Sequence, residues 1–489
     1  MTKLPPKTAL NNLIEAVISE VKTPQQAKVS AIAALLANTE AVNLKEVCES
    51  LGWTSDSEGK PPAQKHIKVA IVDTLIKVAQ KHNWHIIHDA GFFYIYNGAF
   101  WVVLLDSEVK QMLKDAAIKM SYTEIECRDS IFVDKLFQQS VQDGFFAERN
   151  YTKQSIINLK NGSLVLSESG MKMKDFDYRD FLTHQLDFAY NPTAINTVFL
   201  AYLDCVLPDK DTQRTLQQVA GYLFIKGLKM EKVFFLFGLG ANGKSVFFEV
   251  LNGVLGADNI SNYSLESLTD DKGYHRAMIK DKIVNYGTDI RLTKIDAGMF
   301  KTLASGEPIE ARLPYREPFL MTDYAKLIFN VNKMDSANIE HTHGFYRRLL
   351  IIPFNKTIPD EEQDRDLHTK ILLDRPGVLN WIIEGAEQVI KSRNIFISSE
   401  CEAFKQKFIK ESDTVAMYEA DFLETMQGYI YFKSYKEAYP AYKEYCQEAG
   451  HKHPLSRNNF LVRMEALGFE RVKQPAGMFL EKNFLEKRL

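Results

Sequence analysis

Near the amino terminus, hydrophobic residues recur at helical spacing. Between residues 8 and 51, Leu, Ile, Val and Ala return every three or four positions, and a polar stretch with Ser, Gly and Pro follows at residues 54–65. A second helical run fills residues 66–82. Apolar side chains three and four positions apart share one face of a helix. The pattern therefore predicts a small helical domain over residues 1–85.

Two later segments predict β-hairpins. Residues 91–104 and 155–169 are rich in aromatic, β-branched and other apolar side chains, and each contains an Asn-Gly pair, at Asn97 and Gly98 and at Asn161 and Gly162. Asn-Gly is favoured in two-residue hairpin turns because both positions adopt positive φ. We interpret the first hairpin as purely structural and assign both to an α+β region over residues 86–212.

A different pattern begins near Arg214. A helix there leads to KVFFLFGLGANGKSVFFEVLNGVLG, residues 232–256, in which an apolar strand, a glycine-rich loop and an apolar helix follow one another. Further apolar strands are expected within residues 281–290, 324–333 and 346–354. We assign residues 213–396 to an α/β domain. The more polar and helical remainder, rich in Lys, Glu and Tyr, indicates a separate domain over residues 397–489.

The amino-acid composition excludes few classes of protein. The 489 residues are 45% hydrophobic and 25% charged, with a net charge of -3, so any nucleic-acid contact has to come from local basic patches. The five cysteines are scattered without metal-ligand spacing, which favours reduced thiols. No run approaches the roughly 18 apolar residues of a membrane span, and the amino terminus is unlike a signal peptide. We expect a cytoplasmic protein without a membrane partner.

The glycine-rich loop predicts a nucleoside triphosphate site. It has the spacing G-x-x-x-x-G-K-S between a strand and a helix, so its backbone N–H groups can surround phosphate oxygens, its lysine can neutralise the β and γ phosphates, and its serine can ligate Mg²⁺. ATP and Mg²⁺ are the expected cofactors. The predicted contact residues are Gly238, Gly240, Ala241, Asn242, Gly243, Lys244, Ser245 and Val246.

Three strand ends supply further candidates for phosphoryl chemistry. Asp289 follows an apolar strand and is the expected Mg²⁺-side acid, and Asn332 is the expected γ-phosphate sensor. Arg347 and Arg348 precede another strand, where an arginine finger acting across a subunit boundary is expected. The alternatives are a solvated loop aspartate and a solvated basic pair.

These motifs, in this order within roughly 110 residues, resemble those of superfamily 3 helicases, in particular the phage, plasmid and poxvirus primase-helicase family. The resemblance covers residues 86–489 and is strongest over 233–354. It implies an AAA+-like ATPase core in a homo-hexamer, with a hairpin between acid and sensor that grips single-stranded DNA. The matching residues within KTLASGEPIEARLPYREPF are Lys301, Arg312, Tyr315 and Arg316.

This chain departs from the family in two respects. Many relatives carry two acids or a Glu at the strand end, whereas Asp289 stands alone here, which leaves open the residue that orients the hydrolytic water. Residues 1–85 are too short for a primase domain, so a primase or polymerase is expected only as a separate partner.

The carboxyl-terminal residues predict a winged-helix-like domain. A helix, a loop, a second helix over residues 456–467 and a short hairpin follow one another. Winged helices place the second helix in a DNA groove and the hairpin on the backbone. Arg457, Arg463 and Lys473 are the expected DNA contacts, because the segment is locally basic. Protein binding is the alternative use of such a domain.

The sequence therefore predicts a multi-domain α/β and α+β protein with a P-loop AAA+-like ATPase core, helical and α+β amino-terminal regions and a winged-helix-like end. Its expected function is an ATP-dependent DNA helicase that acts on single-stranded or forked DNA during replication of a phage, plasmid or other mobile element, in a bacterial host. One alternative is an ATP-regulated origin-binding or initiation factor without strong unwinding. Another is a P-loop NTPase that acts on protein or RNA.

Overall fold

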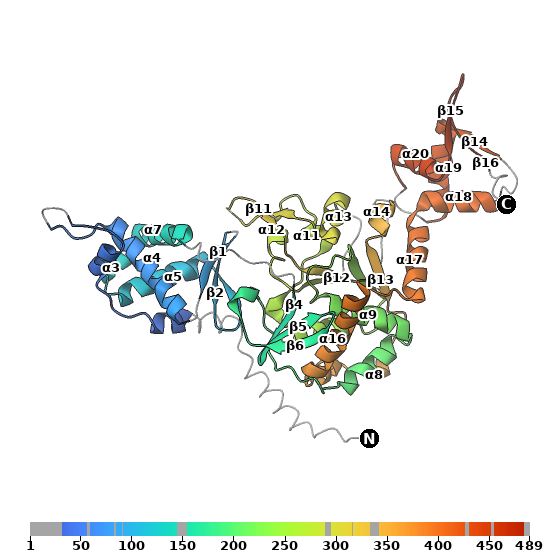
Figure 1. Ribbon diagram of the computed structural model, residues 1–489. Helices are drawn as coiled ribbons and strands as arrows, with labels where there is room; N and C mark the ends of the chain where they lie inside the picture. The colour runs from blue at the N-terminus through green and yellow to red at the C-terminus, as the bar shows by residue number, and fades with distance from the viewer. Residues whose placement is uncertain are drawn as a thin grey trace.

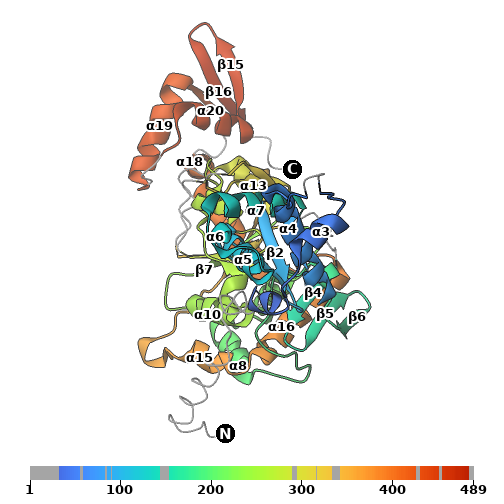
Figure 2. The ribbon, with the colours of Figure 1, turned by 90° about the vertical axis from the view of Figure 1, so that its left-hand side faces the viewer.

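The protein is described by a computed structural model of residues 32–55, 59–82, 85–89, 91–143, 154–288, 295–314, 316–332, 342–425, 430–450 and 454–483. A parallel sheet occupies the middle of the molecule (Figure 1). The amino-terminal helices and the carboxyl-terminal unit lie on either side of it, and the carboxyl-terminal unit projects above the rest in a view at right angles (Figure 2). Within the described residues, no helix combines the length and apolar character that crossing a membrane requires.

The amino-terminal module contains helices and a three-stranded antiparallel sheet. The helices are α3 (Leu44–Ser50), α4 (Gln64–Lys81), α5 (Asp106–Lys119), α6 (Glu124–Cys127) and α7 (Ser130–Asp143). The strands are β1 (Ile86–Asp89), β2 (Phe92–Tyr96) and β3 (Trp101–Leu104), in the order β1-β2-β3. Strands β2 and β3 form the predicted hairpin, which is confirmed, with Gly98 at φ +95°.

A second antiparallel sheet leads into two helices. Its strands are β4 (Ser155–Leu159), β5 (Gly162–Ser167) and β6 (Gly170–Lys174). The hairpin predicted at Asn161 and Gly162 is confirmed, and β6 extends it by one strand. A 3-10 turn, η1 (Tyr178–Asp180), then precedes α8 (Thr197–Val206) and α9 (Lys210–Tyr222).

The parallel sheet has five strands in the order β13-β7-β12-β9-β8. They are β7 (Val233–Phe237), β8 (Ile260–Ser261), β9 (Val284–Gly287), β12 (Lys326–Val331) and β13 (Leu349–Pro353). Both faces of β7 are buried: Phe234 and Leu236 pack in one core, and Val233 and Phe235 pack in another. Such burial explains why its sequence is continuously apolar. The expected α/β core is confirmed at this level, as a parallel sheet with helices.

Short elements fill the connections of the sheet. They are α10 (Lys244–Leu255), η2 (Ala257–Asn259), α11 (Leu265–Leu268), α12 (Tyr274–Ala277), α13 (Ala297–Ser305), the antiparallel pair β10 (Ile309–Ala311) and β11 (Phe319–Met321), and α14 (His343–Tyr346). After the last strand follow η4 (Asp360–Glu362), α15 (Leu367–Leu372) and the longer α16 (Arg375–Ser392).

Helices α9 and α16 cross with their backbones in direct contact. A Cβ atom at Gly221 would lie 2.1 Å from the amide nitrogen of Ala386, and one at Gly385 would lie 2.1 Å from the carbonyl oxygen of Gln217. Only glycine fits at both positions, since real Cβ atoms do not approach backbone atoms so closely. The helix before the sheet is thus joined to the helix after it.

The carboxyl-terminal unit follows α17 (Ser399–Ser412). It contains α18 (Thr414–Thr425), β14 (Ile430–Ser434), α19 (Tyr435–Glu448), α20 (Arg457–Ala466), β15 (Glu470–Gln474) and β16 (Gly477–Asn483), with strand order β14-β16-β15. The predicted second helix and final hairpin are confirmed as α20 and β15-β16, and β14 adds a third strand that the sequence did not indicate.

The hydrophobic cores continue across the three positions at which the sequence suggested boundaries. One core joins Ile71 of α4 to Leu113 of α5, across residue 85. A second joins Ile157 of β4 to Phe234 of β7, across residue 212. A third includes Phe408 of α17, beyond residue 396. Residue 212 lies within α9, whereas residues 85 and 396 lie between elements. At all three positions, neighbouring segments bury apolar side chains against one another.

Candidate functional site

The glycine-rich loop, residues 238–245, follows β7 at the carboxyl edge of the sheet. The amide of Gly238 donates to the carbonyl of Val331 in β12 at 3.0 Å, and the amide of Phe354 after β13 donates to the carbonyl of Phe237 at 2.7 Å. Gly240, Ala241 and Gly243 have φ of +123°, +46° and +85°. The loop is therefore a tight, left-handed turn held between the ends of two neighbouring strands.

Lys244 begins α10 and places its ammonium at the centre of this loop. Its side chain is buried, and its Nζ donates to the carbonyl of Gly238 at 2.6 Å and to Oδ1 of Asn242 at 2.9 Å. Asn242 is buried against Gly238, where an added Cβ would lie 1.9 Å from Nδ2 of Asn242. Ser245 is exposed on the first turn of α10, and Val246 is partly buried. The loop thus converges on one cation at a helix amino terminus, which attracts anions.

Helix α8 forms the floor of the loop. The hydroxyl of Tyr202 donates to the carbonyl of Gly243 at 2.9 Å. A Cβ at Gly243 would lie 2.5 Å from Cγ1 of Val206 and 3.1 Å from Cε2 of Tyr202. Burial strongly raises the pKa of Tyr202, so its hydroxyl stays a donor. The sequence analysis missed this residue, because a helical apolar pattern reveals burial but not a partner 41 positions away.

The neighbouring strand ends bring polar side chains to the same edge. In β12, Oδ1 of the buried Asn330 accepts a hydrogen bond of 2.9 Å from the hydroxyl of Tyr286 in β9. Asn332, the predicted sensor, is exposed one residue beyond Val331, whose carbonyl holds Gly238. Strand β9 ends at Gly287, beside Phe329. Asp289, the predicted acid, lies outside the described residues.

The two predicted arginine fingers have different environments. Both precede β13 at the amino edge of the sheet, where Leu349 pairs with Val233, at the end opposite to the loop. Arg347 is half exposed and pairs with Glu231 at 2.6 Å. Arg348 is 9% exposed, and its guanidinium donates to Oγ of Ser305 at 2.8 Å and to the carbonyl of Gly344 at 2.7 Å. These bonds hold Arg348 inside the protein, so Arg347 is the more accessible of the two predicted fingers.

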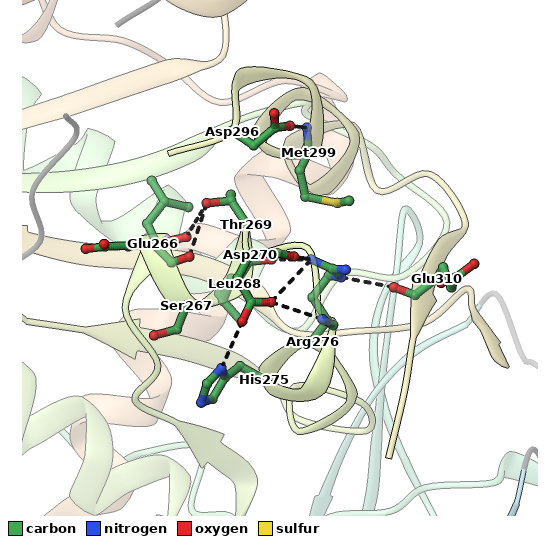
Figure 3. A network of polar contacts seen from close by, with 12 residues as sticks. Glu266, Ser267, Leu268, Thr269, Asp270, His275, Arg276, Asp296, Met299 and Glu310 are labelled. Carbon is green, nitrogen blue, oxygen red and sulfur yellow. Dashed lines mark hydrogen bonds and ion pairs between the residues drawn. The ribbon is translucent and has the colours of Figure 1, made fainter. Parts of the chain in front are cut away.

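The β10-β11 hairpin is fixed at its root by a buried arginine. Nε of Arg276 donates to the carbonyl of Glu310 at 3.0 Å, and Nη1 donates to the carbonyl of Leu268 at 3.1 Å and to that of Asp270 (Figure 3). The close-up shows this side chain between the turn that carries Asp270 and the strand that carries Glu310. A buried guanidinium with all these acceptors ties α11 and α12 to the hairpin.

The tip of the hairpin carries the predicted DNA contacts. Arg312 is exposed, and its Nε donates to the carbonyl of Arg316 at 3.1 Å. Lys301 lies on α13 and is partly buried. Tyr315 lies outside the described residues. Arg316 instead bonds to the amino-terminal module: its Nη2 pairs with Asp106, and its Nη1 donates to the carbonyl of Gly91.

Further contacts join the amino-terminal module to this region. The hydroxyl of Tyr94 donates to Oδ2 of Asp281 at 2.7 Å, and the ammonium of Lys280 pairs with the same carboxylate at 2.8 Å. The ring of Phe92 meets that of Phe319 in β11 edge to face, with centroids 5.8 Å apart. Strand β2 and the start of α5 therefore pack against the hairpin that was expected to grip DNA.

The predicted basic residues of the carboxyl-terminal unit also differ in their exposure to solvent. Arg457 at the start of α20 and Lys473 on β15 are exposed. Arg463 is partly buried in an ion pair, in which its Nη2 and Nε lie 2.5 and 2.6 Å from Oδ2 of the buried Asp413. This ion pair fixes α20 to the junction between α17 and α18, and the role of Arg463 in DNA binding stays a prediction.

Across the described residues, no group of three or more His, Cys, Asp or Glu side chains has the arrangement of a metal site. Of the two residues expected to ligate Mg²⁺, Ser245 is positioned at the first turn of α10, and Asp289 is outside the description. The carboxyl edge of the sheet therefore gathers an anion-attracting loop, Asn332 and the end of β9.

Comparison with known proteins gives a partial match. Residues 236–348 match DUF5906, a family of unknown function. That stretch runs from β7 to Arg348 and includes the glycine-rich loop and the hairpin. Two solved structures of the apo NrS-1 C-terminal region are similar at 10% sequence identity, with TM-scores of 0.46 and 0.43. Each alignment covers 83% of this chain, and they cover 98% and 97% of the NrS-1 chains.

Proposed function

We propose that the protein is an ATP-hydrolysing DNA helicase that translocates on single-stranded DNA during replication of a phage, plasmid or other mobile element. The observation that carries the proposal is the buried ammonium of Lys244 inside the left-handed loop between the ends of β12 and β13. In open α/β sheets, ligands bind at the carboxyl ends of the strands, at the position where the strand order reverses. Strand β7, with later strands on each side, is such a point.

The loop fits the triphosphate of ATP. Gly238 and Gly243 leave no room for a Cβ, and the ammonium of Lys244 donates to two oxygens of the loop. Phosphate oxygens would take over these bonds when the nucleotide binds. Lys244 would neutralise the β and γ phosphates, and Ser245 with Asp289 would hold Mg²⁺, which supplies further charge neutralisation when bound. Asn332 would orient the γ phosphate, because it lies beside Gly238 at the same edge.

The hydrolytic site would be completed by a second copy of the chain. Arg347 lies at the amino edge, separated from its own loop by the full length of β7. Five residues of strand span about 16 Å, which is beyond the reach of an arginine side chain. Head-to-tail packing in a ring would bring Arg347 of one subunit to the loop of the next, and a homo-hexamer is the proposed assembly.

Two surfaces would contact DNA. The hairpin offers Arg312 and Arg316 with Tyr315 between them, a combination that pairs phosphates and stacks on bases without sequence preference. The carboxyl-terminal unit, proposed as a winged helix, offers exposed Arg457 and Lys473 on its second helix and hairpin.

The first test is ATP hydrolysis by Lys244→Ala, with and without a single-stranded oligonucleotide. Loss of the loop cation should lower the oligonucleotide-stimulated rate by about 10²–10³-fold, as for other transition-state donors. Lys391→Ala, an exposed lysine of α16, is the matched control and should hydrolyse ATP at the parent rate. Full stimulated hydrolysis by Lys244→Ala would exclude this loop as the motor site.

A second candidate function is an ATP-regulated replication-initiation factor. The pairing of Arg316 with Asp106 favours it, because a hairpin residue held by the amino-terminal module does not grip DNA in that state. Strand displacement from a forked substrate distinguishes the two: a helicase displaces the strand with ATP, and an initiation factor binds the fork without unwinding it.

A further inference from the structure

A cavity lies at the amino edge of the parallel sheet, at the end opposite to the glycine-rich loop. It has a volume of about 360 Å³ and is formed by residues 226–232 before β7, the end of α13 and residues 322–327 that lead into β12. We call it the amino-edge cavity. Its charged lining residues are Lys226, Lys229, Lys232, Lys326, Glu231 and Asp323.

The two carboxylates of the lining are already paired. Asp323 accepts from Nζ of Lys226 at 2.6 and 2.7 Å, one bond to each oxygen. Glu231 pairs with Arg347 at 2.6 Å. The lining and Arg347 together carry five cations and two anions, which leaves the amino-edge cavity positively charged.

The other three ammonium groups have no carboxylate partner in the described part of the chain. Lys229 donates to the carbonyl of Gly306 at 2.6 Å, and Lys232 donates to the carbonyl of Arg347. The Nζ of Lys326 lies 4.7 Å from the centroid of the Tyr222 ring. A half-buried ammonium facing a ring and other cations is poorly compensated for lost hydration.

The electrostatics of Lys326 agree with this geometry. The pKa of Lys326 is lowered to about 8, chiefly by burial and also by Lys226 and Lys229, while Asp323 opposes the shift. At pH 7, about nine-tenths of the molecules still carry the charge. Burial also lowers the pKa of Lys232, with Lys405 and Arg347 adding to the effect. An anion in the cavity would stabilise the charged form of both lysines.

We propose that the amino-edge cavity binds a phosphate group. Lys229 and Lys232 come from the segment before β7, and Lys326 comes from the start of β12. Each ammonium can donate to an oxygen of a tetrahedral dianion, as lysine does in other phosphate sites. A phosphate group also matches the excess of positive charge in the cavity. The amino-edge cavity and the glycine-rich loop of the same chain lie at opposite edges of the sheet. Arg347, which pairs with Glu231 of the cavity lining, is the one residue shared with the proposed hydrolytic site of a neighbouring subunit.

Inorganic pyrophosphate binding to the full chain tests the site by calorimetry. The parent for this experiment is Lys244→Ala, which removes the cation of the glycine-rich loop as a competing site. The parent should bind pyrophosphate, and adding Lys326→Met should weaken binding at least tenfold, because Met keeps the length of the side chain but lacks its charge. Adding Lys391→Met, the control at an exposed lysine, should leave the isotherm unchanged. Equal binding with Lys326→Met, or no binding by the parent, would overturn the proposal.

A second measurement keeps the inference testable if Lys326→Met folds poorly. Acylation of Lys326 in the Lys244→Ala chain can be followed by mass spectrometry between pH 7 and 10. Bound pyrophosphate should raise the pKa of Lys326, so less neutral amine is present at pH 8 and acylation should slow severalfold. An acylation rate that is the same with and without pyrophosphate would contradict the proposed phosphate site.

The source of the phosphate group is identified by competition. Displacement of pyrophosphate by a single-stranded oligonucleotide, together with weaker oligonucleotide binding by Lys326→Met, assigns the cavity to the nucleic-acid backbone. An isotherm unaffected by the oligonucleotide assigns it to a small phosphorylated ligand. Both results support the shared phosphate chemistry.

Discussion

At the scale of single residues, the hydroxyl of Tyr202 sets the position of Gly243 in the glycine-rich loop. Tyr202→Phe removes this bond and keeps the ring that packs on the loop. The carbonyl of Gly243 keeps its bond from the amide of Phe247, so the variant loses one of two donors. A lost hydrogen bond is worth about 0.5–1.5 kcal/mol, so we expect KM for ATP to rise severalfold with a smaller change in kcat. Steady-state hydrolysis measures KM and kcat, and binding of a fluorescent nucleotide measures the affinity for the nucleotide.

The matched control is Tyr190→Phe, whose hydroxyl is near Met171 and far from the loop. It should leave KM unchanged. If Tyr202→Phe lowered the unfolding midpoint of the nucleotide-free protein and left KM at the parent value, Tyr202 would be structural only.

Local motifs were readable from the sequence, and distant partners were not. The residues from Gly238 to Lys244 could be placed because the motif specifies the turn and the helix start within eight positions. Arg347 and Arg348 are adjacent in sequence, yet one is half exposed and the other is buried on Ser305. Nothing in the pair itself distinguishes them. Likewise, the partner of Arg463 is Asp413, 50 positions away.

At the scale of elements, the amino-terminal module holds the β10-β11 hairpin through the pair of Asp106 with Arg316. If Arg316 grips DNA, phosphate and Asp106 compete for the same guanidinium. Asp106→Asn should therefore raise affinity for single-stranded DNA severalfold, most clearly at low salt, where phosphate contacts are strongest. Fluorescence anisotropy with a labelled oligonucleotide measures it.

Asp115→Asn, on the same helix and bonded only to Gln111, is the control and should bind DNA like the parent. Arg316→Ala should abolish the gain seen with Asp106→Asn. If the double variant keeps the gain, the added affinity comes from another part of the protein.

The hairpins could be predicted because Asn-Gly pairs mark their turns, but the strands that complete each sheet could not. Strand β6 is the sequence GMKMK, in which two methionines alternate with two lysines and no residue is fully buried. Two apolar positions are too few to predict a strand from the pattern. Strand β14 pairs with β16, although α19, α20 and β15 lie between them in the sequence. Such pairings depend on the edge offered by a neighbouring hairpin, which a single segment does not encode.

At the scale of the whole molecule, the two halves of the proposed hydrolytic site lie at opposite edges of one sheet. Arg347→Ala and Lys244→Ala should each be inactive alone. In an equal mixture that exchanges subunits, an intact loop meets an intact neighbouring arginine at about a quarter of the head-to-tail contacts. The hydrolysis rate of the mixture should approach that fraction of the parent rate.

Prior crosslinking of each variant prevents subunit exchange and is the control for the mixture. Activity that stays at the sum of the two separate variants after free exchange would place Arg347 outside the hydrolytic site.

The glycine contact between α9 and α16 also affects how the chain folds during its synthesis. Gly221 leaves the ribosome long before Ala386, by about 165 residues, or on the order of 10 to 30 seconds at ordinary rates of synthesis. During that interval, the parallel sheet can be translated up to β13 while the face of α9 that belongs against α16 has no partner. We therefore expect the nascent chain to need protection from aggregation late in synthesis, and stalled translation before residue 375 to yield a product that does not complete its core.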